Sequence, residues 1–117
     1  MYRGNFNKGK YEGRVGVLFY ENDDDKIKYK GGFMNGLYEG EGKLYWKNGN
    51  MNKLGIWKNG LLNCRICKVY KLSGNLLYKG QVVEGQATIN GEFYDDNGEM
   101  IIEPWDAQAA QKISEYW

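Results

Sequence analysis

Histidine is absent from this sequence of 117 residues. Because histidine is the commonest general base and a frequent metal ligand near neutral pH, its absence removes the usual centre of acid–base or zinc chemistry. No phosphate-binding loop is found either, since Gly40 and Gly42 lie in a hairpin-like segment rather than between a strand and a helix. We therefore expect a protein that is not an enzyme and that holds neither a metal nor a cofactor.

Long hydrophobic runs and a charge bias are also absent. The first residues, MYRGNFNKGKYEG, contain no apolar run and so do not form a signal peptide. No segment approaches the roughly 18–20 apolar residues of a membrane span. Basic and acidic side chains number 16 and 15 and are interleaved, which gives no electrostatic basis for binding nucleic acid. The composition predicts a soluble, cytoplasmic protein of one domain.

Cysteine is scarce, with only Cys64 and Cys67 in the chain. A structural zinc site needs four ligands, and neither further cysteines nor histidines are available to complete one. On a regular strand, residues three apart point to opposite faces, which places the two sulfurs beyond disulfide reach. We therefore expect two free thiols, as in a reducing compartment.

Glycine and aromatic residues are abundant instead, with 17 glycines and an aromatic content of 15%. They recur in a pattern with a period of about 24 residues, which is clearest over residues 29–49. There Tyr29 and Phe33 precede the pair Asn35-Gly36, and two further glycines follow. The pattern divides the chain into four repeats, at 2–28, 29–52, 53–77 and 78–98.

Glycine-bearing turn signals occur in every repeat. Asn-Gly between alternating residues indicates a β-hairpin, because both central residues of a type I′ turn need positive φ. The predicted turn glycines are Gly9, Gly36, Gly49, Gly60, Gly85 and Gly98. Pairing outward from two of these turns predicts the register Phe33–Tyr38, Gly31–Gly40, Lys30–Glu41, Gly40–Trp57, Gly42–Gly55 and Trp46–Met51.

Side-chain alternation in these hairpins gathers the aromatic residues on one face, with glycines among them. The rings can then lie over the bare backbone of neighbouring strands. For any single ring, packing on other rings and glycines is therefore an alternative to contact with a partner. A one-layer sheet cannot cover its own apolar face, and an exposed aromatic patch usually marks a partner site. We predict an aromatic-lined binding groove formed by Tyr2, Phe6, Tyr11, Tyr29, Phe33, Tyr38, Trp46 and Trp57.

The spacing YxGxFxxGxxxGxGxLxW, followed by Asn-Gly, resembles the MORN (membrane occupation and recognition nexus) repeat family. The resemblance covers residues 2 to about 98 and is degenerate from residue 53 onward. It implies a mainly β fold, a single-layer antiparallel meander of hairpins with an aromatic-lined groove. It also implies roles in protein binding and scaffolding, with lipid binding proposed for some members.

Two segments depart from the repeat. The acidic stretch ENDDDK at 21–26 predicts a longer, solvated hairpin loop, and calcium binding is an alternative that lacks EF-hand spacing. Residues 99–103 predict a last strand, closed by Pro104. Residues 105–117 predict a helix with Asp106 as its N-cap, which docks on the last hairpins and caps the stack.

These features favour non-catalytic binding of a protein or peptide, as a small adaptor or inhibitor. One alternative is a module that binds anionic phospholipid at a membrane surface through lysines of the polar face, such as Lys30 and Lys43, although Glu39 and Glu41 lie among them. Another is an inhibitor of a host protein encoded by a mobile element or pathogen. For the partner, a second copy of the chain in a homodimer is a further alternative.

Overall fold

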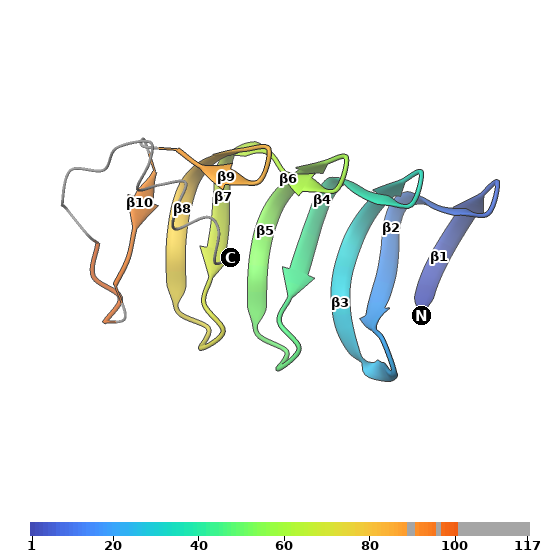
Figure 1. Cartoon of the computed structure of the whole chain (residues 1–117), viewed down its shortest axis with the longest axis horizontal. Coiled ribbons are helices and arrows are strands. Elements are labelled where there is room, and N and C mark those ends of the chain that lie inside the picture. The colour runs from blue at the N-terminus through green and yellow to red at the C-terminus, as the bar shows by residue number, and fades with distance from the viewer. Residues whose placement is uncertain (89–90, 96, 101–117) are drawn as a thin grey trace.

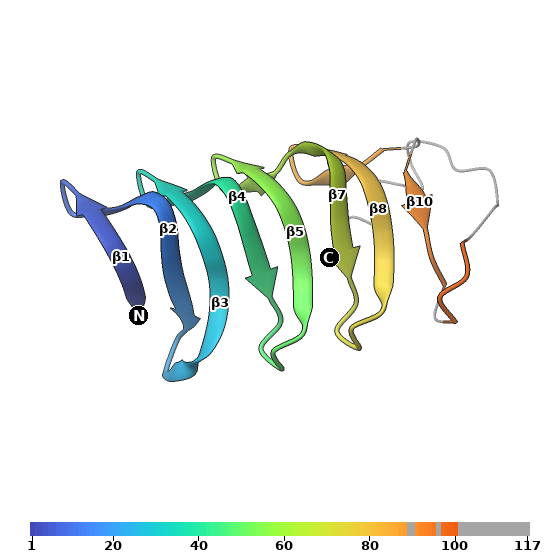
Figure 2. The same cartoon turned by 180° about the vertical axis from the view of Figure 1, so that it is seen from behind.

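The computed structural model describes residues 1–88, 91–95 and 97–100, which form one antiparallel sheet. The strands follow one another across it as a single-layer meander, in agreement with the expected mainly β fold (Figure 1 and, from behind, Figure 2). They are β1 (Tyr2–Asn7), β2 (Lys10–Tyr20), β3 (Asp23–Met34), β4 (Leu37–Tyr45), β5 (Met51–Lys58), β6 (Leu61–Leu62), β7 (Cys64–Tyr70), β8 (Leu76–Val83), β9 (Gln86–Ala87) and β10 (Glu92–Phe93).

The sheet order is β1-β2-β3-β4-β5-β7-β8-β10, with β6 paired to β5 and β9 paired to β8. The molecule is elongated, with principal extents of 48 × 25 × 18 Å. The described part of the chain contains no helix, and so none long and apolar enough to cross a membrane. Of the expected last strand, Met100 bridges to Tyr94, whereas residues 101–103 and the expected helix at 105–117 lie outside the described residues.

Four two-residue turns line one edge of the sheet, the upper edge in Figure 1. Their central pairs all have positive φ, with values of 52° and 82° at Asn35 and Gly36, as a type I′ hairpin requires. Each later turn also bonds to the repeat before it, since the amide of Gly36 donates to the Tyr11 carbonyl at 3.0 Å. The four turns are Lys8-Gly9, Asn35-Gly36, Asn59-Gly60 and Glu84-Gly85.

The loops at the other edge are built differently. We expected a two-residue turn at Asn48-Gly49 that places Trp46 opposite Met51, and this register is wrong. The Trp46 amide donates to the Asn50 carbonyl at 2.8 Å, and Tyr45 lies opposite Met51. The reason is a three-residue loop that ends in a glycine with φ of 93°, a loop type that adds a bulge to one strand.

The register predicted for the second hairpin is correct only near its turn. Phe33 lies opposite Tyr38 as predicted, but the expected pairs Gly31–Gly40 and Lys30–Glu41 are wrong. The structure instead pairs Gly31 with Gly42 and Lys30 with Lys43. The cause is a bulge in β4, where Gly40 has φ of 77° and extra residues lie opposite Gly32. The next pairs, Gly40–Trp57 and Gly42–Gly55, agree with the prediction.

The acidic segment at 21–26 does not form the longer loop that we expected. Tyr20 lies opposite Asp23, so only Glu21 and Asn22 make the turn, and Asn22 has φ of 64°. The surplus residues form an irregularity within β3, where Lys26 lies 3.8 Å from the Asp23 carboxylate. A tight turn followed by a bulge therefore replaces the open loop.

Candidate functional site

Seven of the eight predicted aromatic residues form one continuous array of rings. Its units are two stacked tyrosine pairs, with centroid distances of 3.9 Å for Tyr2–Tyr11 and 3.8 Å for Tyr29–Tyr38. The Phe33 ring stands edge-on between the two pairs, with its centroid 5.0 Å from both Tyr2 and Tyr29. Phe6 contacts the first pair and Trp57 the second, so the array crosses β1 to β5.

Tyr2 and Tyr29, the first tyrosines of the first two hairpin units, each lie over a glycine of the neighbouring strand. A Cβ added to Gly42 would lie 2.6 Å from a carbon of the Tyr29 ring, and one added to Gly16 would lie 2.7 Å from the Tyr2 ring. The Tyr29 hydroxyl then reaches past the glycine and donates to the Gly32 carbonyl at 3.0 Å. The rings therefore pack on bare backbone, as the mixture of glycine and aromatic residues predicts.

Access to the array differs along the stack. Tyr29 and Trp57 are buried and Phe33 is only 3% exposed, whereas Phe6 is 60% exposed. The difference arises because Phe33 lies between two tyrosine pairs, whereas Phe6 contacts one tyrosine pair and lies at the end of the array. Burial, together with the neighbouring Tyr38 and Glu39, raises the pKa of Tyr29, which therefore stays neutral. Phe6, on β1, is the exposed ring of the array, and Tyr2, Tyr11 and Tyr38 are half-buried.

Trp46 is the predicted residue that lies apart from the array. Its indole nitrogen donates to the Tyr70 carbonyl at 3.2 Å, just as the Tyr20 hydroxyl donates to the Tyr45 carbonyl. Both bonds join the edge of one repeat to the edge of the next. The register shift at Tyr45 moves Trp46 out of the alternation on which its expected place depended.

The segment expected as the third repeat, residues 53–77, has no tyrosine at its first position. Lys53 occupies the position of Tyr29, and its burial lowers its pKa. Gly55, which takes the position of Gly31, is covered by a disulfide between Cys64 and Cys67, since an added Cβ would lie 2.7 Å from the Cys64 sulfur.

The expected pair of free thiols is therefore wrong, because the structure bonds the two sulfurs to each other. Cys64 lies opposite Val82 and Cys67 opposite Gly80, so β7 advances by three residues while β8 advances by two. This irregularity turns both sulfurs to one face, with 5.9 Å between the two Cα atoms. The sequence signal that could have shown this is that Cys64 takes the place of Gly40 in the segment where Lys53 replaces the tyrosine.

The face opposite the array carries a transverse row that is rich in lysine. In each strand the residue of this row is the sequence neighbour of a residue on the core side of the sheet, so its side chain points to the other face. Hollows of about 470 Å³ and 440 Å³ lie along it. Its members, from β1 to β10, are Arg3, Val17, Lys30, Lys43, Leu54, Lys68, Lys79 and Glu92.

Among residues 1–88, 91–95 and 97–100, no group of three or more acidic or cysteine side chains is placed to hold a metal ion. What the chain offers is stacking surface on one face and cationic surface on the other. No curated protein matches the sequence. The family model described as MORN repeat matches residues 2–14 and 29–51, and the repeats expected at 53–77 and 78–98 lie beyond these matches. Both matches lie within β1 to β5.

Proposed function

We propose that the chain is a non-catalytic module that binds a protein or peptide at its aromatic face and acts as a small adaptor or inhibitor. MORN repeats generally mediate protein or membrane-lipid interactions. The observation that carries the proposal is the open end of the ring array, where Phe6 is 60% exposed beside the half-buried Tyr2 and Tyr11. Exposed aromatic rings that are already ordered are typical anchors of protein interfaces.

The buried rings have a supporting role in this proposal. Phe33 holds the Tyr2–Tyr11 pair from behind, so a partner meets a surface that loses little side-chain entropy on binding. In addition, β1 is the first strand in the sheet order, so its outer backbone groups are open to an added strand. A partner strand could therefore pair with β1 while one of its side chains covers Phe6.

Affinity capture with three immobilised chains tests this proposal: the parent, Phe6→Ala, and Leu72→Ala as the control. Leu72 is 57% exposed in the loop between β7 and β8, so its truncation removes apolar surface away from the array and from both hollows. We expect Phe6→Ala to keep the parent melting temperature and to lose captured proteins that Leu72→Ala retains. If both variants retain the same partners, or lose them equally, the aromatic end is not the binding surface.

A second copy of the chain is one candidate for this partner. Strand pairing between two β1 edges would form a homodimer that covers both Phe6 rings. Light scattering coupled to size exclusion reports the mass directly, and a dimer that Phe6→Ala converts to monomer would identify the partner. The anionic-phospholipid alternative depends on the lysine-rich opposite face instead, and the geometry of that face favours an acidic peptide over a membrane surface.

A further inference from the structure

Lysine lies directly opposite lysine at two places in the transverse row. Lys30 of β3 pairs with Lys43 of β4, and Lys68 of β7 pairs with Lys79 of β8. Like charges directly opposite one another destabilise an antiparallel pair. Within the part of the chain that the structure describes, none of these four lysines forms an ion pair, although Glu92 of β10 lies opposite Lys79 on its other side and offsets part of the repulsion there. The fold therefore keeps two lysine pairs that an external anion would neutralise.

The two lysine pairs have a defined separation. Leu54 of β5 lies between them in the row, opposite Lys43 on one side and Lys68 on the other. Neighbouring strands are about 4.8 Å apart, so the centres of the two pairs are roughly 14 Å apart. An extended peptide advances about 3.4 Å per residue, and every second side chain points the same way. Side chains four residues apart on one side of such a peptide therefore match the two lysine pairs.

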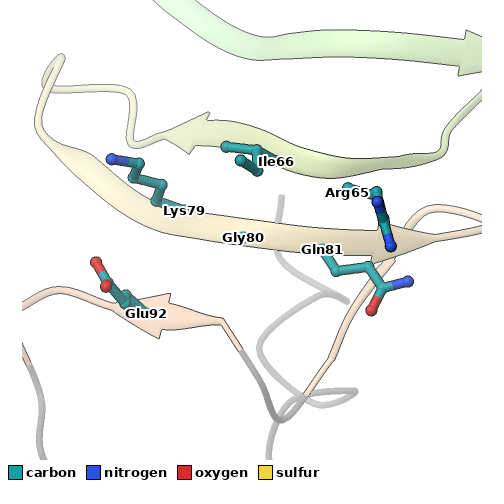
Figure 3. A pocket seen from close by; sticks show the side chains of 6 residues that line it. All are labelled: Arg65, Ile66, Lys79, Gly80, Gln81 and Glu92. Atoms are coloured by element: carbon teal, nitrogen blue, oxygen red, sulfur yellow. The ribbon is translucent and has the colours of Figure 1, made fainter.

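Apolar side chains form the other side of the same face. Lys30 and Lys43 border the hollow of about 470 Å³, and exposed Val15 and Ile56 line it as well. Lys79 borders the hollow of about 440 Å³ together with exposed Ile66 (Figure 3). Both hollows lie over glycine backbone, where missing side chains leave room for a ligand.

We propose that this face binds an extended acidic peptide that runs across the strands. Its carboxylates, four residues apart, meet the two lysine pairs, and the residue midway between them meets Leu54. Its remaining side chains are apolar and meet Ile56 and Ile66. This site lies on the face opposite the aromatic array, so the two proposals succeed or fail independently.

A flat anionic membrane fits this face less well than a peptide does. Arg14 and Arg65 line the two hollows together with the lysines, but the exposed carboxylates of Glu41 and Glu92 border the same hollows. A membrane surface would bring its negative charge against these carboxylates as well as against the lysines, whereas a peptide can place its own carboxylates only where the lysines are.

The test is a titration of the full ¹⁵N-labelled chain, followed by NMR, with the peptide acetyl-GSEVLVESG-amide. The matched control is the isomer acetyl-GSVEVELSG-amide, which has the same composition with its two glutamates two residues apart. We expect the first peptide to shift amide resonances of β3, β4, β7 and β8 along the row and to bind about fivefold more tightly than the isomer. Added salt should weaken the binding, because the charges are exposed.

Two double variants locate the site. We expect K30Q/K43Q and K68Q/K79Q each to weaken binding of the first peptide about tenfold. K30Q/K43Q should not lower the melting temperature, because it removes a repulsive pair, and K68Q/K79Q should leave it nearly unchanged, because it removes both that repulsion and the attraction of Lys79 to Glu92. The control K10Q/K47Q removes the same charge from exposed positions outside the row and should leave the dissociation constant within about twofold.

Several outcomes would overturn the proposal. Equal affinity for the two peptides contradicts the spacing, and equal weakening by K10Q/K47Q shows non-specific charge attraction. Absence of shifts along the row contradicts the site itself. Vesicles of phosphatidylcholine and phosphatidylserine are the remaining arm, and if they engage the row while the peptide does not, the ligand is a membrane surface.

Discussion

Tyr29 shows how a single side chain holds this sheet together. Its ring is fully buried, stacks on Tyr38 at 3.8 Å and covers Gly42, while its hydroxyl donates to the Gly32 carbonyl. Tyr78 repeats the arrangement near the other end of the sheet, where its ring covers Gly91. A single layer has no second sheet to bury its apolar face, so these rings and the bare backbone beneath them form the core.

Replacing Gly42 with alanine tests this packing. The added methyl group would overlap the Tyr29 ring, and overpacking of this kind costs about 1–3 kcal/mol of unfolding free energy. Urea unfolding measures the loss, with Lys43→Ala, an exposed neighbour in the same strand, as the control. The loss should largely vanish when Tyr29 is already alanine. An equal loss in both backgrounds would show that the ring is not the cause.

The disulfide in the third repeat has its own measurable consequence. Closing the short loop between Cys64 and Cys67 stabilises the fold by about 2 kcal/mol if the effect is entropic. Dithiothreitol should therefore lower the urea midpoint of the parent and leave that of the double variant C64S/C67S unchanged. Thiol titration of the oxidised protein, denatured without reductant, should find no free thiol. Two titratable thiols would contradict the bond.

At the scale of the element, the hairpins use two different turn chemistries at the two edges. The turns at one edge have positive φ at both central residues and bond to the preceding repeat. A side chain of that repeat assists, since the Glu39 carboxylate accepts a bond from the Asn59 amide at 3.1 Å. At the other edge, the loops after β4 and β7 have three residues and are joined by Trp46 and by Asn48, whose side-chain amide donates to the Leu72 carbonyl.

Gly36→Val should break the turn of the second hairpin. Gly36 has φ of 82°, and a β-branched residue held there costs about 1–3 kcal/mol. Gly60→Val, at φ of 86°, should behave alike. Asn35→Gly is the control, because glycine accepts the positive φ and should change the unfolding free energy by less than about 1 kcal/mol. If both valine variants melt with the parent, positive φ is not required at these turns.

At the scale of the whole molecule, stability depends on rings shared between neighbouring repeats, and this gives it a pH dependence. Burial raises the pKa of Tyr20, Tyr29 and Tyr38 above the ordinary value of 10.0. A raised pKa in the folded state contributes stability that is complete below the unfolded value. That stability is lost as the pH rises through the folded value, because the unfolded chain ionises first.

The tyrosines should therefore leave the urea midpoint unchanged below about pH 9 and lower it as the pH rises above about 10, whereas Lys53, whose pKa is lowered by burial, adds stability as the pH rises. Tyr29→Phe keeps the ring, the lysine and the fold and removes one ionising group, so its midpoint should fall less steeply than that of the parent. Absorbance of tyrosinate at 295 nm reports ionisation alongside unfolding. Parallel midpoints of the parent and Tyr29→Phe up to pH 12 would show that the Tyr29 hydroxyl is not shielded from solvent.

The sequence by itself determined the meander, the positions of the turns and the place of seven of the eight predicted rings on the aromatic face. These follow from local rules, since Asn-Gly favours positive φ and strand side chains alternate. The structure shows that the same rules failed at Lys30, Trp46 and Cys64, each of which lies next to a bulge.

Only the tertiary structure decided what those bulges produce. An extra residue reverses the face or shifts the partner of every residue beyond it, and its place depends on how rings pack between repeats rather than on local sequence. As a result, Lys30 lies opposite Lys43, and Cys64 is bonded to Cys67 over Gly55. Trp46 lies at the edge of the three-residue loops, where its indole bonds to the Tyr70 carbonyl. Burial of Phe33 and exposure of Phe6 were likewise set by their neighbours, because both residues have the same place in the repeat.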